Sequence, residues 1–214
     1  MVKLSRTKNG ILIMALLILS MLFSFYVSAN DEPVLTSHDG HETISIAINE
    51  INEISINGKE TSFANLSNAL NEQIHGSKDR TVVTIEGEDN TNMEQILTIE
   101  NVLRDAGLFR VVYMNKLGLQ LNLILPPPGA EKNLDHLDPE SLLSIELMEN
   151  GDVKFKGKKL NQGNMKEFIE KKLSENQFAI VRILTHTQTL FADFHHLLKQ
   201  VKQAGAVRIL VDTQ

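Results

Sequence analysis

The 214-residue sequence contains no cysteine. This absence excludes a disulfide framework, catalysis by a thiol and a zinc site with cysteine ligands, although it does not indicate the redox compartment. The sequence also lacks a glycine-rich phosphate loop, a nucleophile elbow and a serine, histidine and aspartate arrangement typical of hydrolases. We therefore predict a protein that is not an enzyme and that uses no cofactor and no metal ion.

Basic residues are scarce in the first half of the chain. Residues 31–115 carry fifteen acidic and five basic side chains, whereas residues 116–214 carry twelve acidic and thirteen basic ones. A segment with this excess of negative charge repels a phosphate backbone, so nucleic acid is not an expected partner. The composition is otherwise that of an ordinary globular protein, with 42% hydrophobic residues.

An approximate repeat with an offset of about 98 residues organises the sequence. Residues 179–212 predict a strand, an amphipathic helix ended by Ala-Gly at 204–205, and a second strand. Residues 81–113 predict the same order, with Ala-Gly at 106–107. A pair of strands and a further helix precede each unit. The fold class that we predict is α+β, an α/β sandwich of two tandem β-β-α-β-α-β domains, each with its own small core.

The repeat also predicts the division of the chain. The segments are a membrane anchor or signal peptide at 1–29, a linker at 30–42, a first domain at 43–115, a connection that could add an edge strand at 116–140, and a second domain at 141–214. At the start of the helix in the first unit, Thr91 and Glu94 have the spacing of a capping box. We prefer this interpretation to cation binding by the acidic turn at 86–90.

One uncharged, apolar run, residues 11–29, precedes the repeat. Basic residues on its N-terminal side and acidic ones on its C-terminal side predict that the N-terminus is cytoplasmic and the bulk of the chain is exported. Two interpretations remain open. The chain could be cleaved after Ala29, as a secretory signal is, and be periplasmic or secreted. The run is also just long enough to remain as a single-pass anchor of the inner membrane, which we favour.

Two groups of side chains are candidate contact sites. The first is a set of serines spaced four residues apart in the apolar run: Ser20, Ser24 and Ser28. Small residues at this spacing permit close packing between membrane helices. The second is a group of lysines in a hairpin of the second repeat: Lys154, Lys156, Lys158 and Lys159. These lysines could contact an anionic surface, although a solvated strand face is the interpretation that we prefer.

The histidines do not form a convincing metal site. His195 and His196 are adjacent, and on a helix adjacent side chains point about 100° apart, so they do not converge on one ion. We expect His196 to lie at the edge of a packed face.

Several short motifs together carry a family resemblance. In the second repeat they are an extended run that ends in proline at 121–126, a Ser-Ile strand with a glycine turn at 144–151, a Phe-Lys-Gly-Lys hairpin at 155–158, and a helix that ends in Ala-Gly at 204–205 before the last strand. With these motifs, residues 121–212 resemble the periplasmic domain of the ExbD/TolR family, the small subunits of proton-driven inner-membrane motors. The first repeat resembles the family more loosely, through residues 82–87 and 104–107.

The resemblance implies a fold, a location and partners. It implies a multi-span membrane partner of the ExbB/TolQ type and a peptide or cell-wall ligand. The tandem domains could form an intrachain version of the dimer that such domains make, and a homo-oligomer stays open. One feature departs from the family: residues 11–29 contain no Asp, Glu, Lys, Arg or His, whereas members that pass protons carry an aspartate in the membrane helix. We therefore expect a non-catalytic binding or scaffold module without its own proton-carrying aspartate.

Overall fold

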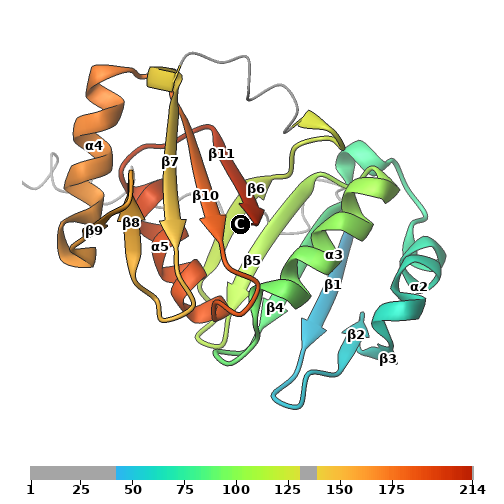
Figure 1. Cartoon of the computed structure of the whole chain (residues 1–214). Coiled ribbons are helices and arrows are strands. Elements are labelled where there is room, and N and C mark those ends of the chain that lie inside the picture. The colour runs from blue at the N-terminus through green and yellow to red at the C-terminus, as the bar shows by residue number, and fades with distance from the viewer. Residues whose placement is uncertain (1–41, 131–138, 214) are drawn as a thin grey trace, which may run out of the picture. The chain divides into compact units, whose positions relative to one another are not determined.

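The computed structural model describes residues 42–130 and 139–213, which form two mixed β-sheets and four α-helices (Figure 1). We call residues 42–130 the first lobe and residues 139–213 the second lobe. The mixed α+β content predicted from the sequence is confirmed. The predicted N-terminal apolar helix lies outside the described residues.

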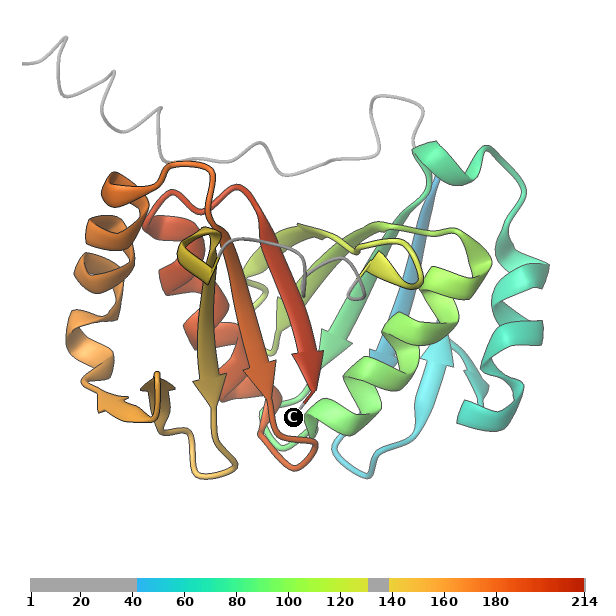
Figure 2. The ribbon, with the colours of Figure 1, turned by 45° about the horizontal axis from the view of Figure 1, so that its top comes forward.

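The first lobe contains a six-stranded sheet. In order across the sheet, its strands are β3 (Lys59–Thr61), β2 (Ile54–Ile56), β1 (Thr43–Ile48), β4 (Val82–Gly87), β5 (Arg110–Asn115) and β6 (Gln120–Ile124). The central strands β1, β4 and β5 are parallel, whereas β2, β3 and β6 pair in antiparallel fashion with their neighbours. Helices α2 (Leu66–Gln73) and α3 (Met93–Ala106) provide the crossovers, and both lie on one side of the sheet in Figure 2.

The second lobe contains a five-stranded sheet with the same plan. In order, its strands are β11 (Ile209–Thr213), β10 (Ile180–Thr185), β7 (Leu142–Leu147), β8 (Val153–Phe155) and β9 (Lys158–Leu160), and its helices are α4 (Met165–Glu175) and α5 (Phe191–Gln203). Strands β7, β10 and β11 are parallel, and β8 and β9 form an antiparallel extension. Short 3-10 turns lie at 63–65, 78–80, 139–141 and 162–164.

The repeat seen in the sequence corresponds to these elements. Strands β4 and β10 start 98 residues apart, as do helices α3 and α5, and β1 and β7 start 99 residues apart. The apolar side of each strand follows from alternation, since Ile44, Ile46 and Ile48 are buried while the residues between them are partly exposed. Glycine ends α3 at the predicted position, because Gly107 takes the left-handed conformation with φ of 76°.

The strand count differs from the prediction. Each lobe has a third short strand, β3 or β9, that the β-β-α-β-α-β pattern omits. In the first lobe, Asn57 and Gly58 both have positive φ and turn the chain from β2 into β3, so these residues connect two strands. The interval 116–140 contributes β6, the last strand of the first sheet.

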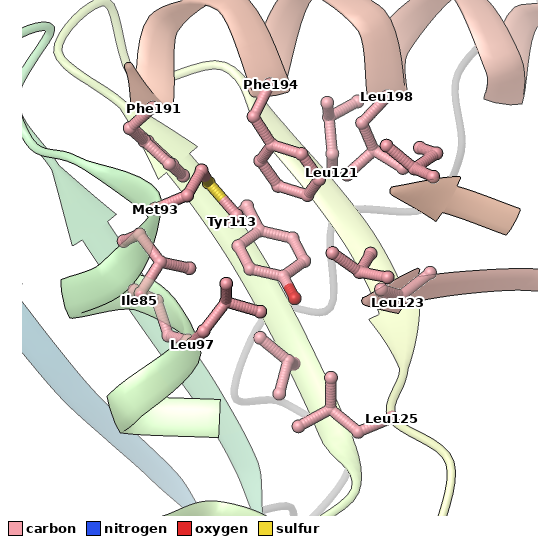
Figure 3. Packing of buried hydrophobic residues seen from close by; sticks show 14 of the residues in the cluster. Ile85, Met93, Leu97, Tyr113, Leu121, Leu123, Leu125, Phe191, Phe194 and Leu198 are labelled. Carbon is pink, nitrogen blue, oxygen red and sulfur yellow. The ribbon is translucent and has the colours of Figure 1, made fainter. Parts of the chain in front are cut away.

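The two lobes share a core, and the expectation of a separate core for each repeat is wrong. The buried apolar side chains of both lobes form one connected cluster, and the described residues belong to one compact unit. Figure 3 shows the reason: Phe191 and Phe194 of α5 extend to Tyr113 of β5 and to Met93 of α3. The apolar face of α5 is wide enough to contact both sheets, so the second lobe completes the core of the first.

Candidate functional site at the contact between the two lobes

A short antiparallel contact joins the segments that precede α3 and α5. The backbone N–H of Met93 donates a hydrogen bond to the carbonyl oxygen of Thr189 at 2.8 Å. The N–H of Phe191 donates to the carbonyl oxygen of Thr91 at 2.7 Å. The repeat offset of 98 relates Thr91 to Thr189 and Met93 to Phe191, so it exchanges these two bonds. Contacts across a two-fold axis have this reciprocity.

Between the two hydrogen bonds, Asn92 faces Leu190, which is again the residue 98 positions further along the chain. We call the segments 91–93 and 189–191 together the interlobe bridge. Its two halves satisfy backbone groups that would otherwise be buried without partners, because Thr91 and Thr189 are fully buried. The lobes therefore meet as a covalently linked pair around equivalent residues.

The helix cap next to the interlobe bridge differs by one residue from the prediction. Asn92, not Thr91, is the N-cap of α3. Its side chain accepts a hydrogen bond from the N–H of Gln95, and the Gln95 side chain accepts one from the N–H of Asn92. The predicted capping box of Thr91 and Glu94 is thus wrong. Thr91 lies directly before this N-cap, and its carbonyl oxygen accepts the hydrogen bond from the N–H of Phe191 in the second lobe.

Aromatic side chains fill the contact beside the interlobe bridge. The Tyr113 ring lies 5.4 Å from the Phe194 ring in an edge-to-face arrangement and 6.4 Å from the Phe191 ring. All three residues are fully buried. Such pairs add to the stabilisation that comes from removing apolar surface from water. Tyr113 thus anchors the second lobe on the first.

Two polar side chains of α5 bind the backbone of the first lobe. His195 Nε2 lies 3.1 Å from the carbonyl oxygen of Leu119, and Lys202 Nζ donates to the carbonyl oxygen of Asn122 at 2.7 Å. Burial lowers the pKa of His195, although hydrogen bonds to backbone oppose the shift. We expected His196 at the edge of the packed face, but His195 is the buried histidine and His196 is exposed.

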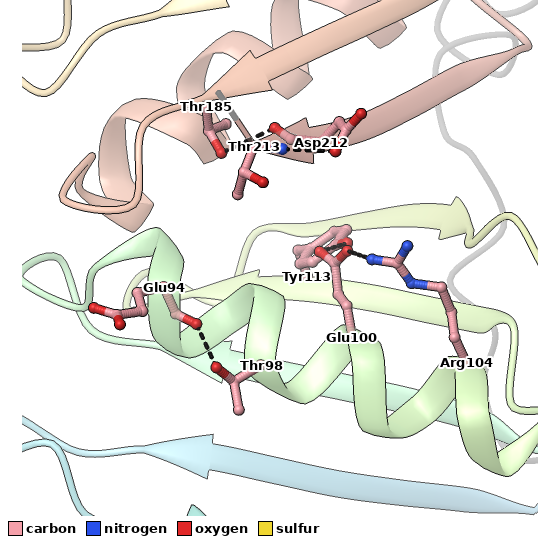
Figure 4. A network of polar contacts seen from close by, with 8 residues as sticks. All are labelled: Glu94, Thr98, Glu100, Arg104, Tyr113, Thr185, Asp212 and Thr213. Carbon is pink, nitrogen blue, oxygen red and sulfur yellow. Dashed lines mark hydrogen bonds and ion pairs between the residues drawn. The ribbon is translucent and has the colours of Figure 1, made fainter. Parts of the chain in front are cut away.

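A buried carboxyl group lies in the same region (Figure 4). Glu100 of α3 is fully buried; its Oε1 accepts a hydrogen bond of 2.7 Å from the Tyr113 hydroxyl, and its Oε2 lies 3.4 Å from Arg104 Nη2. Glu100 is not among the residues predicted from the sequence. The available signal was an acidic side chain inside the apolar stripe of α3, between Ile99 and Leu103.

A crevice of about 190 Å³ lies beside the same stretch of α3. Leu97, Asn101 and Arg104 of α3 line one side, and residues 210–213 of β11 line the other. Leu97 and Arg104 lie one helical turn before and after Glu100, and Asn101 follows it directly, so the crevice runs along the side of α3 next to Glu100. The first and second lobes thus leave a gap near the one fully buried carboxyl group among the described residues.

The predicted lysines lie in the hairpin of β8 and β9, at the outer end of the second sheet. Lys159 forms an ion pair of 2.7 Å with Asp152 and holds the pKa of that carboxyl below its usual value. Lys156 lies 5.4 Å above the Phe155 ring, a cation–π contact. Lys154 and Lys158 lie on opposite faces of the hairpin, so the four charges do not form one flat patch.

An acidic groove of about 460 Å³ lies at the opposite end, between the β2–β3 hairpin and the ends of β4 and β5. Lys116 lines this groove, and its Nζ forms ion pairs with Glu50 Oε1 at 2.9 Å and with Glu88 Oε2 at 3.2 Å. Among the described residues, no three histidine or carboxylate side chains are grouped as metal ligands. Within the turn at 86–90, Glu86 accepts a hydrogen bond of 2.7 Å from the Ser45 hydroxyl, and Glu88 is the carboxylate that pairs with Lys116.

The predicted membrane-helix face of Ser20, Ser24 and Ser28 lies outside the described residues. Within residues 42–130 and 139–213, none of the helices has the length and apolar character needed to cross a bilayer.

The fold and the contact define a class: two similar α+β lobes fused in one chain and paired through equivalent residues. A comparison with family models then gives the relationship. Residues 13–118 match the model of biopolymer transport protein ExbD/TolR, and through this segment the chain belongs to the ExbD/TolR family. The sequence motifs place the clearer resemblance at 121–212, whereas the match covers the apolar run and the first lobe. Proteins of curated function give no significant match.

The family gives a coarse functional context. Its members are non-enzymatic proteins of energy-coupled biopolymer transport, anchored in the inner membrane with a periplasmic domain. They generally work with multi-span membrane proteins of the ExbB/TolQ type.

Proposed function

We propose that this protein is a non-catalytic, membrane-anchored periplasmic scaffold in an energy-coupled transport or envelope complex. The observation that carries this proposal is the extent of the family match, which begins at residue 13 inside the apolar run and continues through the first lobe. A removable signal peptide is not part of the mature domain that such a family shares. A match that joins the apolar run to the lobe therefore favours a retained anchor.

The anchor would bring the chain to a multi-span partner of the ExbB/TolQ type. Its small-residue face, Ser20, Ser24 and Ser28, would allow close packing against the helices of that partner. Residues 11–29 contain no Asp, Glu, Lys, Arg or His, so a group that carries protons would belong to another subunit. The role of this chain would be to bind and position, not to conduct protons.

The exported region would bind its ligand through sheet edges. Strands β6 and β11 end the two sheets where the lobes meet, while β3 and β9 end them at the far sides. An extended peptide can add a strand to an edge of a β-sheet through backbone hydrogen bonds. The lysine hairpin at β9 offers positive charge for an acidic segment of such a peptide or for an anionic cell-wall ligand.

The experiment is to express the full chain in a cell with an inner membrane, separate membrane from soluble fractions, and determine its N-terminus by mass spectrometry. The expected result is an N-terminus at Met1 or Val2 in the membrane fraction, together with a co-purifying multi-span protein. A mature chain that starts at Asn30 in the soluble fraction would overturn the proposal. It would support the alternative, a secreted, signal-cleaved protein with tandem ligand-binding domains.

A further inference from the structure

Burying the carboxyl group of Glu100 costs free energy. It is fully buried where α3 faces the second lobe, and its partners are the hydroxyl of Tyr113 and the guanidinium of Arg104. An ionised carboxyl group without water is strongly disfavoured unless hydrogen bonds and opposite charge compensate it fully. The bond from Tyr113 is short at 2.7 Å, but the contact with Arg104 is long at 3.4 Å. The compensation is therefore incomplete.

The second lobe shows that the fold does not require a carboxyl group here. The repeat offset places Leu198 at the position equivalent to Glu100, and Val211 at the position equivalent to Tyr113. Both are buried apolar residues. The same helix-on-sheet contact is thus made once with leucine and valine and once with an ionisable pair. Packing alone does not explain the glutamate.

The location of Glu100 connects its charge to the contact between lobes. Tyr113, whose hydroxyl donates to the Glu100 carboxylate, packs its ring edge-to-face on Phe194 of α5. On the other side, the residues of α3 around Glu100 line the crevice against β11. Water that enters the crevice would solvate the carboxylate and separate α3 from β11 at the same time.

We propose that Glu100 is a proton-responsive switch of the contact between the two lobes. When Glu100 is protonated, α3 stays packed against β11 and α5; when it ionises, water enters the crevice and this packing loosens. The other charged groups around the contact are Arg104 on α3, Asp212 of β11 in its ion pair with Arg182 of β10, and His195 and Lys202 on α5.

The direction of the response follows from burial. Desolvation raises the pKa of Glu100 to about 7, although the Tyr113 hydrogen bond and the Arg104 charge oppose the shift. Burial, and then the neighbouring carboxylate, raise the pKa of Tyr113 as well, so the hydroxyl keeps its proton. In an open state that exposes Glu100 to water, its pKa returns towards 4.5. Between these two values, opening becomes more favourable by up to about tenfold for each unit of pH increase.

Hydrogen exchange of the full chain in detergent micelles, followed by mass spectrometry, tests the proposal. The amides of Met93 and Phe191 are the reporters, because each donates across the interlobe bridge. After correction for intrinsic exchange rates, we expect their protection to fall at least tenfold between pH 5.5 and pH 8. Protection of β7 and β10 amides, within the second sheet, should change much less.

Three variants separate the switch from general effects. Glu100→Gln should remove the fall in protection with rising pH and leave only the opposite dependence that His195 causes, whereas the exposed Glu72→Gln on α2 should leave the wild-type profile unchanged. Tyr113→Phe removes a hydrogen bond that favours the carboxylate, so it should move the midpoint to higher pH. This variant also serves if Glu100→Gln does not fold. Equal pH dependence in wild type and Glu100→Gln, no pH dependence in the wild type, or a uniform change over all amides would overturn the proposal.

Discussion

Gly87 lies under the ring of Phe191. A Cβ atom at position 87 would come within 2.6 Å of Phe191 Cδ1, closer than side-chain atoms approach one another. Gly87 ends β4 in the first lobe, and Phe191 begins α5 in the second. The residue equivalent to Gly87 in the second lobe is Thr185, so the repeat itself does not need glycine here. Glycine is needed at position 87 because Phe191 of the other lobe approaches the backbone there closely.

The first prediction follows from this contact. Gly87→Ala should destabilise the protein by about 1–3 kcal/mol, because the added methyl group forces the Phe191 ring and α5 away from the sheet. The φ angle of Gly87 does not lie in the left-handed region, so alanine causes no backbone strain of its own. Denaturant unfolding followed by circular dichroism measures the loss.

A matched variant shortens the side chain that the new methyl group would meet. Phe191→Leu leaves room above position 87, so the double variant should lose less free energy than the two single changes together. Additive losses in this double-mutant cycle would contradict a direct clash between residues 87 and 191.

The second prediction concerns the aromatic contact of α5. Phe194→Ala should cost about 3–5 kcal/mol, because it leaves a cavity against Tyr113 in the shared core. Phe178→Ala makes the same chemical change at a side chain that is 63% exposed, and it should cost less than about 1 kcal/mol. Thermal or denaturant unfolding compares the two. Similar losses would show that Phe194 does not hold the lobes together.

The third prediction is the pH dependence of stability. The pKa of Glu100 is raised on folding, from 4.5 to about 7, so the folded state binds its proton more tightly than the unfolded state. The free energy of unfolding that this raised pKa contributes is fully present below pH 4.5 and is lost as the pH rises through 7. Glu100→Gln should therefore become more stable relative to the wild type with rising pH, by about 3 kcal/mol at most.

His195 acts in the opposite direction, which makes the comparison with a variant necessary. Its pKa is lowered on folding, so the stability that it provides is lost as the pH falls below 6.5. The wild-type profile combines both groups, and only the difference between the wild type and Glu100→Gln isolates the carboxyl group. A difference that stays constant from pH 5 to pH 8 would contradict the shifted pKa.

The fourth prediction tests the proposed membrane contact. Replacing Ser24 by leucine fills the small-residue face of the apolar run and should weaken co-purification with a multi-span partner. Leu22→Phe also adds volume, but about 200° away around a helix, and it should leave co-purification intact. Both variants should stay in the membrane fraction, as immunoblots of fractions would show. Equal loss of the partner in the two variants would argue against a specific serine face.

Local chemistry made much of the fold predictable. Gly107 ends α3 where an Ala-Gly pair predicts it, since glycine adopts positive φ at little cost. The capping box lies one residue later than predicted. Thr91 and Asn92 are both residue types that cap helices well, and only the structure shows that Thr91 binds the N–H of Phe191 while Asn92 caps α3. His195 and His196 could not be ranked for burial, since the second sheet and β6 together decide which face of α5 is covered.

The sequence by itself determined the order of the longer strands and the helices, the 98-residue repeat and the side of each of those strands that turns inward, because periodicity, caps and turns act over a few residues; it did not reveal the short strands β3 and β9. Only the tertiary structure decided that the two repeats share one core, that residues 91–93 pair with residues 189–191, and that Glu100 is enclosed beside Tyr113. These contacts join residues 13 to about 100 positions apart, and burial depends on what lies across the interface, which no local pattern records.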